Sequence, residues 1–414
     1  MDYYFGQENA FHVMAKSTGS ECNLDCTYCY YLEKTKLYPR AGTQRMSLKV
    51  AEEYVRQYIQ AQPVPLVNFV WQGGEPCLNG LEFFKRIVGF QKKYAGNKQI
   101  TNSFQTNGVL LNKEWCHFFK EHDFLIGISV DGPREIHDYY RRMKSGNPTW
   151  DRVMRGVNLL QEHEIEFNTL SVVNDFNVDY PLEVYHFLKE IGSRFHQYIP
   201  VVERKAVHES SFPLTLVSPD YRNEARLTDW SVDSRKYGEF LVAIFDEWVR
   251  HDVGHYFVQI FDATLASWAG EDPGLCVYQE TCGNALVMEH NGDVYSCDHY
   301  VYPENCLGNI TKNGLDEMVV LPEHIAFGKN KQDRLPEYCR RCEYRFACNG
   351  ECPKHRFLKA PDGEPGLNYL CEGLKFYYKH AAPYMQFMTN QLKTEQAPAN
   401  IMECLRINGT LPSS

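Results

Sequence analysis

Three cysteines near the start of the chain have the residue type and spacing that suit an iron–sulfur cluster. Cys22, Cys26 and Cys29 follow the pattern Cys-x3-Cys-x2-Cys. A four-iron cluster normally takes four thiolates, so three would leave one iron open to bind and activate a substrate. The alternative is a structural zinc site, which needs a fourth Cys or His close by, and the nearest histidine, His12, lies upstream on a predicted strand. The spacing therefore favours an open-site cluster.

A second group of cysteines lies in the C-terminal part of the chain. Its members are Cys276, Cys282, Cys297, Cys339, Cys342, Cys348, Cys352 and Cys371. Eight thiolates are enough for two fully ligated four-iron clusters. Two zinc ribbons are the alternative, although the x5 and x3 gaps fit ribbon spacing poorly. Packing residues or free thiols are expected at the remaining cysteines, Cys77, Cys116, Cys306 and Cys404.

Two further features could hold a ligand. The segment Gly73–Pro76 follows an apolar strand, and its adjacent glycines would let a ligand approach the backbone closely, although a plain turn has the same composition. Arg141 has a planar fork that fits a carboxylate. A solvated surface charge beside Arg142 and Lys144 is an equally compatible interpretation of that arginine.

Regular alternation of strands and helices positions these residues. Six strands are predicted at 11–18, 67–71, 100–105, 125–130, 166–173 and 194–201. Helices are predicted between them at 47–61, with Ser47 as its cap, and at 79–95, 112–121, 149–163 and 178–191. Such alternation indicates βαβ units and an α/β fold with a parallel sheet, here a partial (β/α)6 barrel. The chemistry of such barrels lies at the C-terminal ends of the strands.

Four parts are predicted along the chain. Residues 1–234 form the partial barrel and end in a polar segment at 203–234. Residues 235–275 form a helical linker with helices at 235–251 and 256–269, the first of which has an apolar face of core residues, Phe240, Ile244, Phe245 and Trp248. Residues 276–395 form the cysteine-rich domain, and residues 396–414 a tail that we expect to be mobile.

Composition excludes several classes of protein. The net charge of −10 and the lack of a basic block argue against a nucleic-acid partner. The first eight residues have neither a basic nor an apolar region of a signal peptide, and no apolar run is long enough to cross a membrane. We therefore expect the 15 cysteines to lie in a reducing cytoplasm, where they more often bind metal than form disulfides.

Taken together, these motifs resemble radical S-adenosylmethionine enzymes that carry a C-terminal SPASM domain. Within that group the chain is most similar to the anaerobic sulfatase-maturating enzymes. The resemblance extends from about residue 12 to 385 and is carried by the segments Cys22–Cys29, Trp71–Pro76, Gln105–Gly108, Ser129–Pro133 and Val294–Tyr300.

The resemblance implies the cofactors and their ligands. S-adenosylmethionine would bind the open iron of the first of three 4Fe-4S clusters. Its other contacts would be Tyr28, Tyr31, Gly74, Ser129, Arg141 and Val202. One auxiliary cluster would be held by Cys276, Cys282, Cys297 and Cys352. The other would be held by Cys339, Cys342, Cys348 and Cys371.

The implied reaction is oxidation of one Cys or Ser of a sulfatase to Cα-formylglycine by a 5′-deoxyadenosyl radical under anaerobic conditions. Asp298, next to Cys297, would be the base that takes the thiol or hydroxyl proton, and a partly dry site can raise a carboxylate pKa toward that task. The partners would be a sulfatase polypeptide with a Cys/Ser-x-Pro/Ala-x-Arg motif and an electron donor such as flavodoxin or ferredoxin.

Two other functions stay open at this point. One is a SPASM peptide maturase that forms thioether or carbon–carbon crosslinks, which often has a peptide-binding segment before the barrel. Only about ten residues precede the first predicted strand here. The other is a non-enzymatic iron–sulfur electron-transfer protein, which would need neither an open-site cluster nor the glycine-rich segment. The residues also leave open the choice between Cys-type and Ser-type sulfatases.

Overall fold

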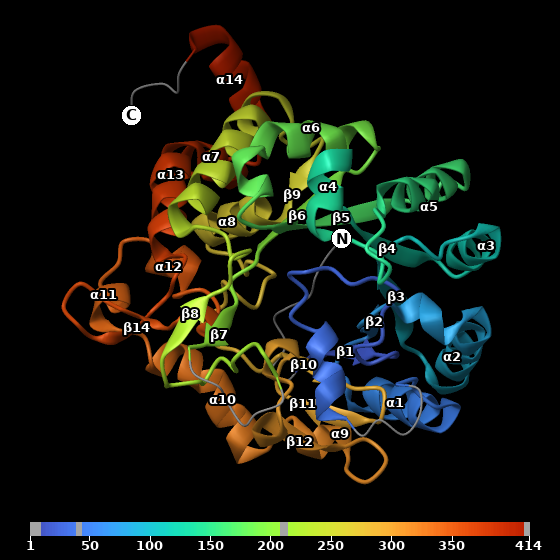
Figure 1. The fold of residues 1–414 in the computed structure, drawn as a ribbon. Coiled ribbons are helices and arrows are strands. Elements are labelled where there is room, and N and C mark those ends of the chain that lie inside the picture. The colour runs from blue at the N-terminus through green and yellow to red at the C-terminus, as the bar shows by residue number, and fades with distance from the viewer. Residues whose placement is uncertain (1–9, 39–43, 208–213, 410–414) are drawn as a thin grey trace.

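Figure 1 shows the fold in a computed structural model, which describes residues 10–38, 44–207 and 214–409. The start of the chain, on which the expectation of no signal peptide rests, lies outside these residues, as do part of the 203–234 segment and the end of the tail. The main sheet consists of β1 (His12–Lys16), β2 (Leu66–Gln72), β3 (Gln99–Thr106), β4 (Phe124–Ser129), β5 (Phe167–Val173), β6 (Phe195–Pro200), β9 (Phe257–Val258), β10 (Ala285–Met288), β11 (Asp293–Tyr295) and β12 (Cys306–Asn309).

The helices follow the strands in chain order. They are α1 (Leu48–Ala61), α2 (Leu81–Tyr94), α3 (Lys113–Glu121), α4 (Arg134–Tyr140), α5 (Trp150–Glu162), α6 (Pro181–Glu190), α7 (Ser234–His251), α8 (Gln259–Ala269), α9 (Leu315–Met318), α10 (Pro322–Asp333), α11 (Glu337–Arg340), α12 (Arg345–Cys348), α13 (Cys371–Lys393) and α14 (Asn400–Asn408). All six predicted barrel strands are present within two residues of the expected bounds. The short helix α4 was not predicted.

The six strands β1 to β6 pair in parallel and in sequence order, which confirms the predicted α/β partial barrel. Side chains alternate between two faces of each strand. On β2, Trp71 is fully buried and packs edge-on against Tyr54 of α1 and Phe84 of α2. The other face of the sheet is polar and half-buried, and Gln105 of β3 donates a hydrogen bond to Ser129 Oγ of β4 at 3.1 Å. The helices therefore cover the apolar face, and the polar face lines the barrel interior.

The sheet continues beyond the predicted barrel at both edges. At one edge β10 pairs in parallel with β1, with Met14 opposite Val287, and β11 and β12 follow antiparallel. At the other edge β9 pairs in parallel with β6. Because β10 to β12 belong to the predicted cysteine-rich domain, one sheet crosses the boundary that we placed at residue 275. The four-part division remains a prediction from the sequence.

The helical linker and the C-terminal helix form one packed unit. The predicted core residues of α7 are all buried: Phe240, Ile244, Phe245 and Trp248. Helix α13 approaches α7 so closely that a Cβ on Gly373 would lie 1.8 Å from the carbonyl oxygen of Ser234. Only glycine allows that approach, which fixes the start of α13 and therefore Cys371.

The 203–234 segment contains a β-hairpin that the sequence did not predict. Strands β7 (Arg204–Ala206) and β8 (Ala225–Leu227) pair antiparallel. The guanidinium carbon of Arg204 lies 4.4 Å from the centroid of the Phe357 ring, which joins the hairpin to the cysteine-rich domain. In Figure 1 this green hairpin lies beside the orange segment that carries α10 to α12.

The expectation of a mobile tail is wrong for the residues of α14. This helix packs against α7 and α13, and its side chains Ile401 and Leu405 are buried. The expectation of mobility rested on the prolines and terminal serines of the tail. Ile401 and Leu405 lie one helical turn apart, and this apolar pair packs α14 against the core. None of the helices in the described ranges is long and apolar enough to cross a membrane.

We expect Ile401→Ala to lower the free energy of unfolding by about 2–4 kcal/mol, because it leaves a cavity at a fully buried position. Ile407→Ala is the matched control on the same helix, since that side chain is 65% exposed and its loss should change stability by less than ~0.5 kcal/mol. Urea unfolding of the anaerobically purified protein measures both. Equal, small effects would contradict the packing of α14.

Candidate active site

The three N-terminal cysteines lie together on the loop that follows β1. Cys22 Sγ accepts a hydrogen bond from the backbone N–H of Leu24 at 3.4 Å and one from Asn107 Nδ2 at 3.7 Å. None of the three forms a disulfide. Burial raises the pKa of Cys22 to about 12 and that of Cys26 to about 11, so the thiols hold their protons until a cation replaces them. Metal binding at this loop must therefore release protons.

The glycine-rich turn after β2 holds the cysteine loop in place. Gly74 N–H donates to the carbonyl of Gly19 and Glu75 N–H to the carbonyl of Glu21, both at 2.8 Å. A Cβ on Gly74 would lie 1.9 Å from the Glu21 carbonyl oxygen. The sequence suggested that this glycine admits a ligand, whereas in the structure it admits the cysteine loop itself. Contact of Gly74 with S-adenosylmethionine stays a prediction.

Glu75 connects this turn to the end of β3. Its buried carboxylate accepts hydrogen bonds from Thr106 Oγ1 and from the backbone N–H groups of Asn107 and Cys77, at 2.8 to 3.0 Å. Asn107 in turn donates to Asn23 Oδ1 at 2.7 Å. Two strand ends and the cysteine loop therefore share one hydrogen-bond network.

Arg141 is buried, so its interpretation as a solvated surface charge is wrong. Its Nη1 donates to the hydroxyl of Tyr28 at 2.9 Å, and that hydroxyl donates to Asp131 Oδ2 at 2.5 Å. Arg141 Nε is buried without a hydrogen-bond partner. Ser129 lies at the end of β4 on the same polar face. The structure therefore brings Tyr28 to the mouth of the barrel beside Ser129 and Arg141, which were expected there, and the contact of all three with S-adenosylmethionine stays a prediction.

Tyr31 and Val202 occupy two other positions. The Tyr31 hydroxyl donates to the buried carboxylate of Glu289, and Lys16 Nζ lies 4.4 Å from the centroid of the Tyr31 ring. Val202 is buried after β6 and lines a cavity described below. The predicted contacts of both with S-adenosylmethionine remain predictions.

Asp298 lies beside the cysteine loop, although 268 residues separate it from Tyr30. The Tyr30 hydroxyl donates to Asp298 Oδ2 at 2.9 Å. Burial alone would raise the pKa of Asp298, but His299, Lys16 and the Tyr30 hydroxyl outweigh it and hold that pKa below its usual value. The expectation of a raised pKa was therefore wrong in direction. His299 follows Asp298 directly in the sequence, whereas the contributions of the buried Lys16 and of Tyr30 depend on the fold.

The eight C-terminal cysteines are electrostatically coupled in two groups with the membership that the resemblance implied, and the binding of a cluster by each group stays a prediction. Burial raises the pKa of Cys297, Cys352 and Cys276, and the charges that these cysteines and Cys282 exert on one another raise it further. Burial likewise raises the pKa of the second set, where Cys348 is coupled to Cys371 and Cys339, and Cys371 also to Cys342. Among the described residues, no three His, Cys, Asp or Glu side chains converge tightly enough for a single metal ion. Mutual proximity thus defines the two sets.

Two buried cations accompany these sets. Lys331 Nζ donates to the carbonyls of Cys276 and Val277 at 2.7 and 2.9 Å. The positive charge of Arg356 lowers the pKa of Cys282 in the first set and of Cys339 in the second, against the raising effect of burial. We infer from this that Arg356 lies close to both sets. Positive charges at these places suit anionic iron–sulfur clusters.

Unpartnered buried polar atoms mark where a ligand is missing from the hydrogen-bond network. Six of them lie around the barrel mouth, on Ser17, Thr18, Glu21, Asn23, Arg141 and His299. Buried polar groups normally have partners. Three of these residues lead into Cys22 and Asn23 follows it directly, so the site fits a polar cofactor such as S-adenosylmethionine.

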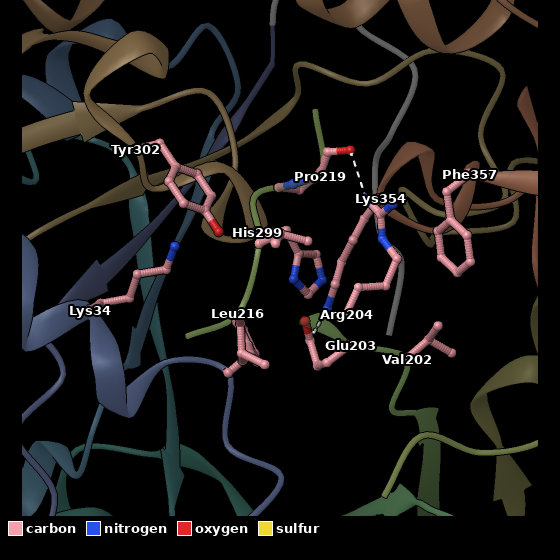
Figure 2. Close-up of a pocket in the computed structure, with 12 residues that line it drawn as sticks. Lys34, Val202, Glu203, Arg204, Leu216, Pro219, His299, Tyr302, Lys354 and Phe357 are labelled. Carbon is pink, nitrogen blue, oxygen red and sulfur yellow. Dashed lines mark hydrogen bonds and ion pairs between the residues drawn. The ribbon is translucent and has the colours of Figure 1, made fainter. Parts of the chain in front are cut away.

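A cavity opens between the barrel mouth and the cysteine-rich domain (Figure 2). It contains about 390 Å³ of space, part of which is open to solvent. Its lining includes Tyr30 from the cysteine loop, Val202 from the end of β6, and His299 from the residue after Asp298. Elements from both halves of the chain therefore meet at one chamber beside the cysteine loop.

Comparison with known proteins identifies the family. The model of the Radical SAM superfamily matches residues 17–188, and that of SPASM, an iron–sulfur cluster-binding domain, matches residues 276–343. A serine-type anaerobic sulfatase-maturating enzyme from Bacteroides thetaiotaomicron is 50% identical over 395 residues, 95% of each chain. The chain belongs to the anaerobic sulfatase-maturating enzymes.

More distant members of this family agree. A cysteine-type anaerobic sulfatase-maturating enzyme from Clostridium perfringens strain 13 is 32% identical over 386 residues, which cover 92% of this chain and 99% of that one. The solved structure of native anSMEcpe with bound AdoMet and a Kp18Cys peptide has a TM-score of 0.78 at 31% identity, covering 92% of this chain and 99% of that chain. The prediction of a radical S-adenosylmethionine enzyme is confirmed, and the electron-transfer alternative is wrong.

Several residues of this maturating enzyme's site were missed from the sequence. Lys16 and Glu203 are buried and Lys354 is half-buried at the barrel mouth or the cavity, and Lys354 Nζ forms an ion pair with Glu203. Tyr30 was missed although it follows Cys29 directly. Lys16 could have been found from the sequence, because it stands at the C-terminal end of an apolar strand, where the chemistry of such barrels lies.

We expect Gly74→Ala to lower the iron content by about four irons per chain, because the new Cβ collides with the backbone of the cysteine loop. Gly89→Ala is the matched control, since a Cβ there meets nothing within 4 Å. Iron analysis of anaerobically reconstituted protein measures both. Full iron content in Gly74→Ala would show that the loop does not depend on this contact.

Proposed function

We propose that the enzyme oxidises a Cys or Ser of a sulfatase polypeptide to Cα-formylglycine at the cavity of Figure 2. The observation that carries this assignment is the contact between Tyr30 and Asp298, which places a carboxylate between the Cys22–Cys29 loop and the first C-terminal cysteine set. A carboxylate beside the first C-terminal cysteine set is suited to take the proton of the target residue, while a cluster held by an auxiliary set would accept its second electron.

The chain offers ligands for three 4Fe-4S clusters and one S-adenosylmethionine. Cys22, Cys26 and Cys29 would hold the open cluster, and the two C-terminal sets the auxiliary clusters. Tyr28, Tyr31, Gly74, Ser129, Arg141 and Val202 would hold S-adenosylmethionine. When bound, these groups would supply the 5′-deoxyadenosyl radical that removes hydrogen from Cβ and would accept the second electron.

The chain's own residues supply the acid–base and positioning functions. Asp298 takes the proton of the target thiol or hydroxyl; its lowered pKa keeps the carboxylate ionised, while making it a weaker base than an ordinary carboxylate. The Tyr30 hydroxyl and the charge of Lys16 hold the carboxylate in place. The buried ion pair of Lys354 and Glu203 closes one wall of the cavity and helps exclude water.

The partners follow from the same assignment. The substrate is a sulfatase segment with the motif Cys/Ser-x-Pro/Ala-x-Arg, presented unfolded or during synthesis. The reductant would be a small electron-transfer protein such as flavodoxin or ferredoxin in a reducing cytoplasm. The net charge of −10 gives no basis for nucleic-acid binding.

The direct test is anaerobic incubation of the reconstituted enzyme with S-adenosylmethionine, a reductant and peptides carrying this motif. Mass spectrometry should show the aldehyde on the Cys or Ser of the motif. Formation of a crosslink within the peptide, with no aldehyde, would favour the alternative of a thioether- or carbon–carbon-forming maturase.

We expect about twelve irons per chain in the reconstituted enzyme. Replacing Cys22, Cys26 and Cys29 together with Ala should remove about four irons and abolish cleavage of S-adenosylmethionine. Cys306→Ala is the control, because this exposed cysteine belongs to none of the three sets. A wild-type content of only about four irons, or zinc at the C-terminal cysteines, would contradict the auxiliary clusters.

We expect Asp298→Asn to keep all clusters and to form 5′-deoxyadenosine, while the yield of formylglycine falls by about 100-fold, the lower end for losing a general base. The exposed Asp316→Asn should leave both products unchanged. Quantifying 5′-deoxyadenosine and aldehyde in the same reaction separates hydrogen removal from proton removal. Near-normal formylglycine in Asp298→Asn would remove this residue from the mechanism.

A further inference from the structure

His299 brings an unpartnered imidazole to the cavity. Its Nδ1 is buried and has no hydrogen-bond partner. The ring packs against the ring of Tyr30, with centroids 5.1 Å apart, and Figure 2 shows it among the side chains of Glu203, Leu216 and Lys354. Among the described residues no group forms a hydrogen bond with this nitrogen, although buried polar atoms normally have such partners.

The other polar side chains around the cavity are already engaged. Lys354 is paired with Glu203, and the Tyr30 hydroxyl with Asp298. Lys34 Nζ donates to the carbonyl of Val301 at 3.2 Å and lies 3.3 Å from the centroid of the Tyr302 ring. Arg204 donates to the Pro219 carbonyl at 3.3 Å. His299 therefore differs from these neighbours in offering a free hydrogen-bonding group.

His299 and Asp298 are consecutive residues of one short 3-10 helix, Asp298–Tyr300. A neutral imidazole carries one N–H donor and one acceptor nitrogen. A carboxylate can only accept, whereas the imidazole can donate. Together they match a hydroxyl group, which donates one hydrogen bond and accepts another.

We propose that His299 donates a hydrogen bond to the oxygen of a target serine while that hydroxyl faces Asp298, and that this contact makes the enzyme prefer serine over cysteine. The inference rests on the proposed function and specifies its substrate. An oxygen accepts such a bond strongly, whereas the sulfur of a thiol accepts it weakly. A site built to hydrogen-bond a substrate hydroxyl discriminates against an analogue that lacks it.

The test compares two peptides that carry the sulfatase motif and differ only in Ser or Cys at the target position. The wild-type enzyme should have the higher kcat/KM for the Ser peptide. His299→Phe should lower kcat/KM for the Ser peptide by about 100-fold, the lower end for losing one positioned donor, and that for the Cys peptide by less than about 3-fold. His299→Gln, which keeps an N–H donor, should recover much of the preference for serine.

Leu216→Ala is the control, because this buried apolar residue lines the same cavity and should affect both peptides equally. Binding of the two labelled peptides without reductant gives a second readout, in which His299→Phe should weaken only the Ser peptide. A wild-type preference for cysteine, or an unchanged Ser-to-Cys ratio in His299→Phe, would overturn the proposal. Formation of 5′-deoxyadenosine with no aldehyde from either peptide would instead overturn the proposed function.

Discussion

The parallel pairing of β1 with β10 is the interaction on which the site depends. Strand β1 leads into the cysteine loop, and β10 leads into Glu289. Because their carboxyl ends lie at the same edge of the sheet, Tyr31 and Glu289 meet there although 258 positions separate them. Strand β11 pairs antiparallel with β10 and leads into Cys297 and Asp298, which the hydrogen bond from Tyr30 joins to the cysteine loop. The C-terminal half of the chain thereby completes the mouth of the barrel.

Charge balance is the second constraint. Eleven cysteines, the proposed iron ligands, lie in three mostly half-buried groups, and burial opposes the ionisation that iron binding would require. Lys16, Lys331 and Arg356 bring positive charge to these groups, and each is itself largely buried. A buried cation is costly unless an anion accompanies it. The cations and the clusters would therefore stabilise one another, which couples assembly of the cofactors to the packing of the protein.

Local patterns in the sequence predicted the parts of the structure that depend on local physics. Strand and helix periodicity located β1 to β6 and α7, and the cysteine spacings singled out the two groups of candidate ligands, while the division of the C-terminal group into two sets came from the family resemblance. Contacts between distant segments could not be found in this way. The burial of Arg141 depends on Tyr28 and Asp131, the lowered pKa of Asp298 in part on Lys16, and the close backbone contact of Gly74 on Glu21. Each was misjudged or left open because its cause lies far away in the chain.

The central claim is that a radical formed at the Cys22–Cys29 loop reaches the Cβ of a target residue in the cavity beside Asp298. A motif peptide with its target serine deuterated at Cβ tests this most directly. The account predicts that deuterium appears in 5′-deoxyadenosine in the same amount as formylglycine is formed. Unlabelled 5′-deoxyadenosine accompanied by formylglycine would contradict it, because the hydrogen would then have left Cβ by another route.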